Sequence, residues 1–144
     1  MIYFDTSYLL KCYLAEPGHE VVRKLAREAG PLACVSYGAV ECRAGVHRHL
    51  REGKLSVAEA AVVFQVMQRD DEMGVVTWFP VTAELLDRVK REFENLAAAV
   101  FLRTADALHL LCAREQGFRE IYSNDRHLLT AATHFALAGK NVIL

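Results

Sequence analysis

Residues 2–7, IYFDTS, place three apolar side chains directly before an acid and two hydroxyl side chains. The apolar run predicts a short buried strand, and the pattern after Asp5 predicts a helix. Outward from this junction, short apolar runs predict further strands near residues 32–35, 75–81, 121–122 and 141–144. Helical patterns separate the strands, over about residues 7–15, 19–29, 36–51, 56–73, 82–98, 104–116 and 126–137.

Strands that alternate with helices are typical of βαβ units, which build a parallel sheet with helices on both faces. We therefore predict an α/β fold, a three-layer α/β/α sandwich with a central, mainly parallel sheet. The 144 residues are 53% hydrophobic and 24% charged, which is a globular composition. No internal repeat or Pro/Gly-rich linker divides them, so we expect residues 1–144 to form one domain.

The composition also excludes some classes of protein. The formal net charge of −1 argues against a polybasic protein that holds nucleic acid by bulk charge. No uncharged run is long enough to span a bilayer, and the N-terminus lacks a basic signal-peptide region, so we expect a cytoplasmic protein. The four cysteines, which form no C-x-x-C pair, are expected to be free thiols: Cys12, Cys34, Cys42 and Cys112.

Four acids lie near the ends of the predicted strands. Asp5 follows the first strand, and Glu41 lies in the first turns of the helix after the second. Asp106 opens the helix before the strand at residues 121–122, and Asp125 follows that strand. Because parallel strands end at one edge of a sheet, where ligands bind, we expect these acids to meet there.

Each acid has a simpler explanation when it is taken alone. Asp5 and Asp125 suit helix N-caps, Asp106 suits the positive end of a helix dipole, and Glu41 suits a solvated helix face. Together, however, two carboxylates about 4 Å apart repel by about 4 kcal/mol at an effective dielectric of 20. Such a cluster persists if it takes up protons or binds a hard cation such as Mg²⁺. A bound metal would activate water, so the cluster suggests phosphodiester hydrolysis.

Four segments in order resemble the PIN-domain ribonucleases, most closely the VapC-type toxins of prokaryotic toxin–antitoxin modules. They are IYFDTS at residues 2–7, VSYGAVE at 35–41, LRTADALHL at 102–110 and YSNDRHL at 122–128. The resemblance implies that a metal site of Asp5, Glu41, Asp106 and Asp125 binds Mg²⁺ or Mn²⁺ and cleaves RNA. It also implies a homodimer and a cognate antitoxin that inhibits the enzyme with a basic side chain.

Several other residues could assist such a site. The resemblance gives supporting polar roles to Thr6, Ser123 and Asn124. A basic stretch over residues 43–54 fits either an RNA phosphate track or a solvated helix face, and it contains Arg43, His47, Arg48, His49, Arg51 and Lys54. Arg103, three residues before Asp106, is a further candidate for contact with RNA or with a carboxylate of the site. His109 falls on the Asp106 side of its helix, and because no other histidines accompany it, we expect packing rather than metal binding.

Two other functions compete with a ribonuclease. A phosphatase of the haloacid-dehalogenase type also begins with an acid after its first strand, but it needs a second acid two residues later, where this chain has Ser7. A binding module without activity could use the same fold, although a scaffold gains nothing from clustered charge. Divalent-metal binding distinguishes the enzyme from the scaffold.

Overall fold

The computed structural model describes residues 1–143, whose strands and helices alternate along the chain. The strands are β1 (Ile2–Tyr3), β2 (Leu32–Val35), β3 (Val76–Phe79), β4 (Glu120–Tyr122) and β5 (Ala138–Lys140). The helices are α1 (Thr6–Tyr13), α2 (His19–Ala29), α3 (Tyr37–Arg51), α4 (Val57–Met73), α5 (Ala83–Asn95), α6 (Thr104–Glu115) and α7 (Arg126–Ala131), and a 3₁₀ turn η1 (Ala132–Phe135) follows α7.

The strands form two parallel sheets, β1-β2-β3 and β4-β5, and together these make one layer in the spatial order β3-β2-β1-β4-β5. β2 pairs with β1, where Leu32 lies opposite Ile2, and on its other side with β3. β4 pairs in parallel with β5. The two halves meet just beyond β1, where Phe4 forms a parallel bridge with Tyr122 and the Asp5 N–H donates to the Tyr122 carbonyl at 3.0 Å.

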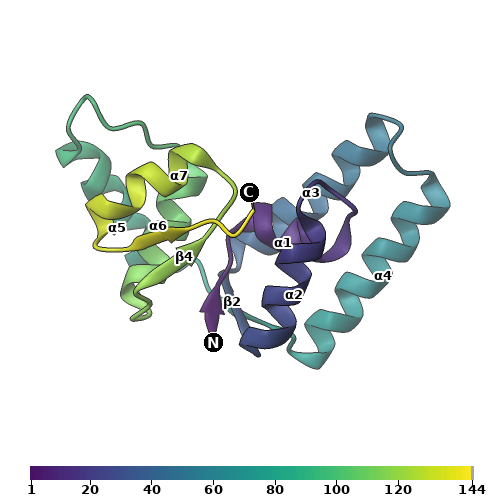
Figure 1. Cartoon of the computed structure of the whole chain (residues 1–144). Coiled ribbons are helices and arrows are strands. Elements are labelled where there is room, and N and C mark those ends of the chain that lie inside the picture. Colours follow the sequence, from purple (N-terminus) through teal and green to yellow (C-terminus); the bar gives the residue numbers. More distant parts are fainter. Residues whose placement is uncertain (144) are drawn as a thin grey trace.

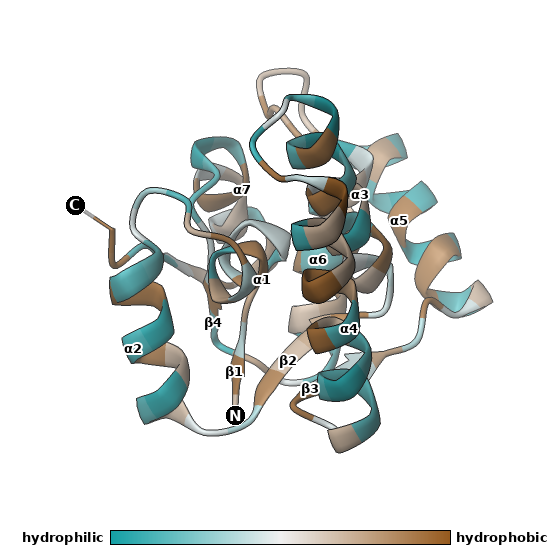
Figure 2. Ribbon diagram, turned by 90° about the vertical axis from the view of Figure 1, so that its right-hand side faces the viewer, coloured by the Kyte–Doolittle hydropathy of each residue, from teal (hydrophilic) through white to brown (hydrophobic). Residues whose placement is uncertain are grey.

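The helices cover both faces of this sheet, which confirms the predicted α/β/α sandwich. α1–α4 lie on one side of the strands, whereas α5–α7 lie on the other (Figure 1). Successive strands are added on one side of β1 up to β3, and β4 and β5 are then added on its other side. Because crossovers between parallel strands are right-handed, the helices that follow β3 must cover the opposite face of the sheet. The strands are mainly hydrophobic, and the outer side of α2 is hydrophilic (Figure 2).

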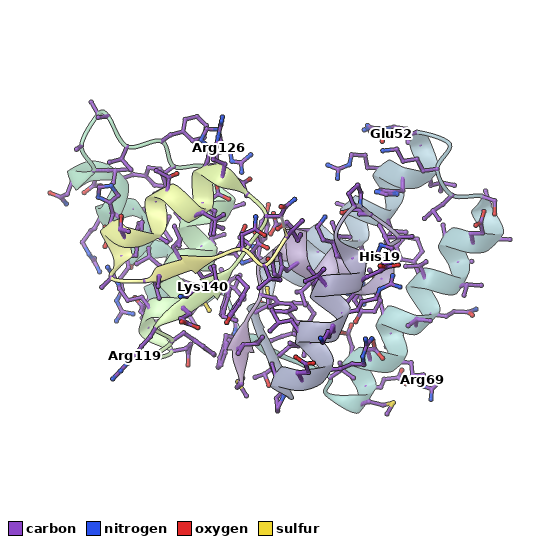
Figure 3. The ribbon with its side chains drawn as sticks, in the orientation of Figure 1. His19, Glu52, Arg69, Arg119, Arg126 and Lys140 are labelled. Atoms are coloured by element: carbon purple, nitrogen blue, oxygen red, sulfur yellow. The ribbon has the colours of Figure 1, made fainter. Side chains whose placement is uncertain are left out.

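The change of side after β3 also places the carboxyl ends of β1 and β4 side by side. Arg126, at the start of α7, and Glu52, just after α3, lie on opposite sides of this edge (Figure 3). The core beneath it includes Tyr3, Phe4 and Leu110, all fully buried. Any side chain that follows β1 or β4 is therefore held over a rigid base.

The prediction of a last strand at residues 141–144 was wrong. The strand is β5, whose residues are all exposed and small or polar, so it lacks the apolar pattern of a strand. After it, Asn141 accepts a hydrogen bond from the Tyr8 hydroxyl, and the Val142 N–H donates to the same hydroxyl. The apolar residues at 142–143 thus pack beside α1 instead of extending the sheet, and Leu144 lies outside the described residues.

One local prediction also needs correction, and two helix starts have features of their own. The helix predicted over 126–137 stops at Ala131 and continues as a 3₁₀ turn, which ends where Ala136 takes a φ of +57°. Ser36 does not cap α3 with its side chain, because its hydroxyl accepts the Val81 N–H instead. The N-cap of α6 is Arg103.

Candidate active site

Asp5 stands at the junction of β1 and α1, where it is 4% exposed. It caps α1 through Oδ1, which accepts the Tyr8 N–H at 3.1 Å and the Ser7 hydroxyl at 2.7 Å. Oδ2 accepts the Ser123 hydroxyl at 2.5 Å. Burial raises the pKa of the Asp5 carboxyl above its ordinary value, and the His109 charge and these hydrogen bonds offset that rise only in part.

Glu41 is held by two side chains from other elements. Its Oε1 accepts the Thr6 hydroxyl at 2.7 Å and lies 2.8 Å from His109 Nε2. The other ring nitrogen of His109 lies 3.2 Å from the Tyr3 hydroxyl, whose oxygen accepts the Val35 N–H. Although burial alone would raise the pKa of Glu41, the hydrogen bonds and charge of His109 and the Thr6 hydroxyl lower it.

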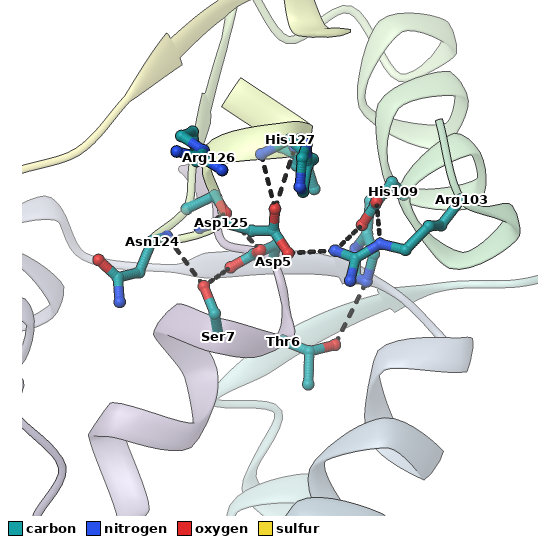
Figure 4. A network of polar contacts seen from close by, with 12 residues as sticks. Asp5, Thr6, Ser7, Arg103, His109, Asn124, Asp125, Arg126 and His127 are labelled. Atoms are coloured by element: carbon teal, nitrogen blue, oxygen red, sulfur yellow. Dashed lines mark hydrogen bonds and ion pairs between the residues drawn. The ribbon is translucent and has the colours of Figure 1, made fainter. Parts of the chain in front are cut away.

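Arg103 joins the other two acids. Its Nε donates to Asp106 Oδ2 at 2.9 Å, and its Nη2 donates to Asp106 Oδ1 at 3.4 Å and to Asp125 Oδ2 (Figure 4). These bonds raise the pKa of the guanidinium. Burial would raise the pKa of Asp125, but the Leu128 and His127 N–H groups and Arg103 lower it overall.

The capping interpretation holds for Asp5 and Asp125. Asp5 and Asp125 are N-caps, yet each uses one carboxylate oxygen for the cap and turns the other toward a neighbouring segment. All four acids line one cleft of about 1200 Å³. The fold therefore places the four predicted acids around one cleft.

The supporting polar residues link the acids to one another. Ser123 donates to Asp5 and accepts the Asp125 N–H at 2.8 Å, so it joins the ends of β1 and β4. Asn124 is exposed and lines the cleft, and its backbone N–H donates to the Ser7 hydroxyl at 2.9 Å. Ser7 was not among the predicted site residues, because nothing in the sequence marks it beyond its position two residues after an acid.

Tyr3 also supports the site and was not among the predicted site residues. It is fully buried, and its hydroxyl holds His109, which is itself 2% exposed and holds Glu41. A buried phenol usually needs a hydrogen-bond partner, so a tyrosine in a core strand could have indicated a buried polar contact. His109 packs beside the acids, as predicted.

The predicted basic stretch divides between two places. Arg43, Arg48 and Arg51 line the cleft with the acids, but Arg43 is also paired with Asp71 on α4 at 2.6 Å. Lys54 does not line the cleft, and it pairs with the neighbouring Glu52 at 3.1 Å. Arg103, which lies outside this stretch, contacts the acids directly.

The residues fit a divalent cation in their chemistry, because carboxylate oxygens are the ligands that Mg²⁺ prefers. Among residues 1–143, no three His, Cys, Asp or Glu side chains lie close enough together to hold a metal ion. The Arg103 guanidinium instead supplies the positive charge between Asp106 and Asp125. A metal bound by these two acids would need the same oxygens.

Comparison with known proteins identifies the fold. A family model described as the PIN domain matches residues 2–133. The chain belongs to the PIN-domain family. No curated protein sequence matches it significantly.

Solved structures resemble this PIN domain over nearly its whole length. VapC20 of Mycobacterium tuberculosis, described as a toxin that cleaves the sarcin–ricin loop, matches with a TM-score of 0.71 and 18% identity, over 91% of this chain and 95% of that one. FitAB bound to an IR36 DNA fragment matches with a TM-score of 0.64 and 18% identity, over 98% of this chain and 94% of that one. At this identity the likeness shows the fold.

Two simpler expectations can also be compared with the structure. Within residues 1–143 no helix is both long enough and apolar enough to cross a membrane. All four cysteines are free, and Cys34, Cys42 and Cys112 are buried. The prediction of free thiols is confirmed.

Proposed function

We propose that this PIN domain is an endoribonuclease that depends on Mg²⁺ or Mn²⁺ and hydrolyses RNA phosphodiester bonds. The main observation in its support is that one cleft is lined by arginines from α3 and by four acids, Asp5, Glu41, Asp106 and Asp125. The acids would hold the cation, which when bound would activate water and stabilise charge on the phosphate. The family assignment and the fold likeness to a toxin described as cleaving the sarcin–ricin loop support this proposal.

The other side chains of the cleft have separate tasks in this proposal. Thr6 and His109 would keep Glu41 ionised and oriented, and Ser123 would keep Asp5 and Asp125 at a fixed spacing. Arg48 and Arg51, both exposed at the cleft, would bind RNA phosphates and offset the repulsion between RNA and the acids.

Cleavage of a mixed single-stranded RNA tests the proposal. Activity is expected with Mg²⁺ or Mn²⁺ and not in EDTA, and Asp106→Asn and Glu41→Gln are expected to reduce it by more than about 100-fold. Glu94→Gln, which changes an exposed acid on α5 outside the cleft, is the matched control and should be fully active. Equal activity in Asp106→Asn and Glu94→Gln would refute the proposed site.

A PIN-fold scaffold without activity remains the second candidate, because Arg103 already pairs with two of the acids. Calorimetric titration with Mg²⁺ or Mn²⁺ separates the two functions. Binding in the millimolar range or tighter supports the nuclease, and no binding supports the scaffold. The family assignment gives no support to the phosphatase alternative.

We also propose that the protein is the toxin of a type II toxin–antitoxin pair, acts in the cytoplasm and forms a homodimer. The fold likeness to VapC20 supports the toxin role. Exposed apolar side chains on α3 and α4, such as Val40 at 63% and Val62 at 58%, are available for contact with a protein partner. Light scattering should give twice the monomer mass, and expression should arrest growth unless the antitoxin is co-expressed.

A further inference from the structure

Two aromatic rings from separate segments stack at the surface of the molecule. Phe101 lies in the connection between α5 and α6, and His127 is the second residue of α7. Their ring centroids are 4.1 Å apart, and the ring planes meet at 34°. Phe101 remains 55% exposed although the imidazole lies against it, so more than half of the residue's surface is open to solvent.

Both rings are tied to the acids of the cleft. Arg103, two residues after Phe101, pairs with Asp106 and Asp125. His127 lies two residues after Asp125, and its backbone N–H donates to Asp125 Oδ1 at 2.8 Å, so the two lie side by side in Figure 4. Neither ring lines the cleft itself, but two extended residues span at most about 7 Å, so the backbone of each ring residue lies within that distance of a residue that does.

We propose that Phe101, backed by His127, is a stacking surface for one RNA base next to the phosphate held at the acids. This inference rests on the proposed ribonuclease function. Unpaired RNA bases stack readily on aromatic side chains, and every base has a face that can stack. The arginines of the cleft would contact only phosphates, which carry no sequence information, so the stacking surface would add the contact to a base.

Exposure alone does not support this role, because single exposed apolar residues are ordinary on protein surfaces. Phe101 differs from such residues because its ring is packed against His127. This contact fixes the orientation of the Phe101 ring. Phe93 on α5 provides the comparison, because it is also exposed, at 38%, but it is neither stacked in this way nor tied to the acids.

The test measures the binding of short fluorescent single-stranded RNA by anisotropy. All variants carry Asp5→Asn, which is expected to stop cleavage while the RNA is bound. Phe101→Leu keeps an apolar side chain but removes the ring, and it is expected to weaken binding roughly 5-fold to 150-fold. Phe101→Tyr retains the ring and should bind within about 2-fold of the parent, as should Phe93→Leu.

An RNA series with one abasic nucleotide at each position in turn then identifies the stacked base. At one position, loss of the base should weaken binding by the parent but leave Phe101→Leu unaffected, because the lost contact is the same. Equal binding by Phe101→Leu and Phe93→Leu would overturn the inference. An effect of Phe101→Leu that persists with every abasic RNA would overturn it too, because a structural disturbance does not depend on a base.

The outcome also separates this inference from the proposed function. Cleavage by the unmodified protein together with equal binding by Phe101→Leu and Phe93→Leu would overturn the stacking surface alone. The expected abasic pattern without any cleavage would support the stacking surface and overturn the nuclease. Absence of both cleavage and RNA binding would overturn both.

Discussion

Replacing Arg103 with glutamine should make the metal-free protein less stable and its metal binding tighter. The guanidinium contacts Asp106 at 2.9 Å and also pairs with Asp125. Coulomb's law gives about 1.4 kcal/mol for such a contact in water and about 6 kcal/mol at a dielectric of 20. Because the Arg103 side chain is 51% exposed, solvent screening applies, and we expect the two contacts together to be worth roughly 1–2 kcal/mol.

The free energy of the two Arg103 contacts predicts a change in thermal stability and a change in metal affinity. In EDTA, Arg103→Gln should lower the Tm by roughly 2–8 °C. A metal at Asp106 and Asp125 would compete with the guanidinium for the same oxygens. In Arg103→Gln the metal no longer has to break contacts worth roughly 1–2 kcal/mol, so Mn²⁺ should bind roughly 5-fold to 30-fold more tightly. Calorimetry measures the affinity, and a thermal melt with and without Mn²⁺ measures the stability.

Arg119→Gln is the matched control, because Arg119 is exposed and lies far from the cleft, at the lower left of Figure 3. It should change neither the Tm in EDTA nor the Mn²⁺ affinity. Equal Mn²⁺ affinity in Arg103→Gln and Arg119→Gln would refute the reasoning, because it would show that metal and guanidinium do not compete for the two acids.

Three further predictions follow from the site and its support. Because the folded-state pKa of Asp5 is raised, its ionised form lowers the stability of the fold as the pH rises through that pKa. In EDTA at pH 8, the Tm of Asp5→Asn should therefore be no lower than that of the parent. Any gain in Tm should vanish in acid, where Asp5 is protonated. A Cβ at Gly38 would lie 2.5 Å from Cys34 Sγ, so Gly38→Ala should cost about 1–3 kcal/mol in denaturant unfolding, and Cys34→Ala should recover most of that loss in the double variant. Arg48→Gln with Arg51→Gln should reduce the slope of log K against log salt for single-stranded RNA by about 1.4.

Most of the fold could be predicted from periodicity, because its core strands and long helices have clear apolar patterns. Residues 32–35 are buried throughout and matched the predicted strand. β5 could not be found in this way, because it is held by backbone pairing with β4 rather than by buried side chains. The end of η1 at Ala136 depends on a left-handed backbone that its residue type does not favour.

That Asp5 and Asp125 lie near each other could be predicted as well, because topology brings the ends of β1 and β4 together. The partners of the four acids were harder to predict. Arg103 was recognisable as a neighbour of Asp106 three residues away on a helix, but its contact with Asp125 spans 22 residues and requires the fold. The link from Tyr3 through His109 to Glu41 likewise joins three elements, and no local pattern indicates it.

These partners explain how a chain with a net charge of −1 tolerates its carboxylate cluster. Asp5 is compensated by hydroxyl hydrogen bonds and a raised pKa, and Glu41 by His109. Only Asp106 and Asp125 depend on a half-exposed cation, Arg103, which a stronger cation could displace. Metal binding should therefore respond to loss of Arg103 in a nuclease, whereas in a scaffold the same change should lower stability without creating a tighter metal site.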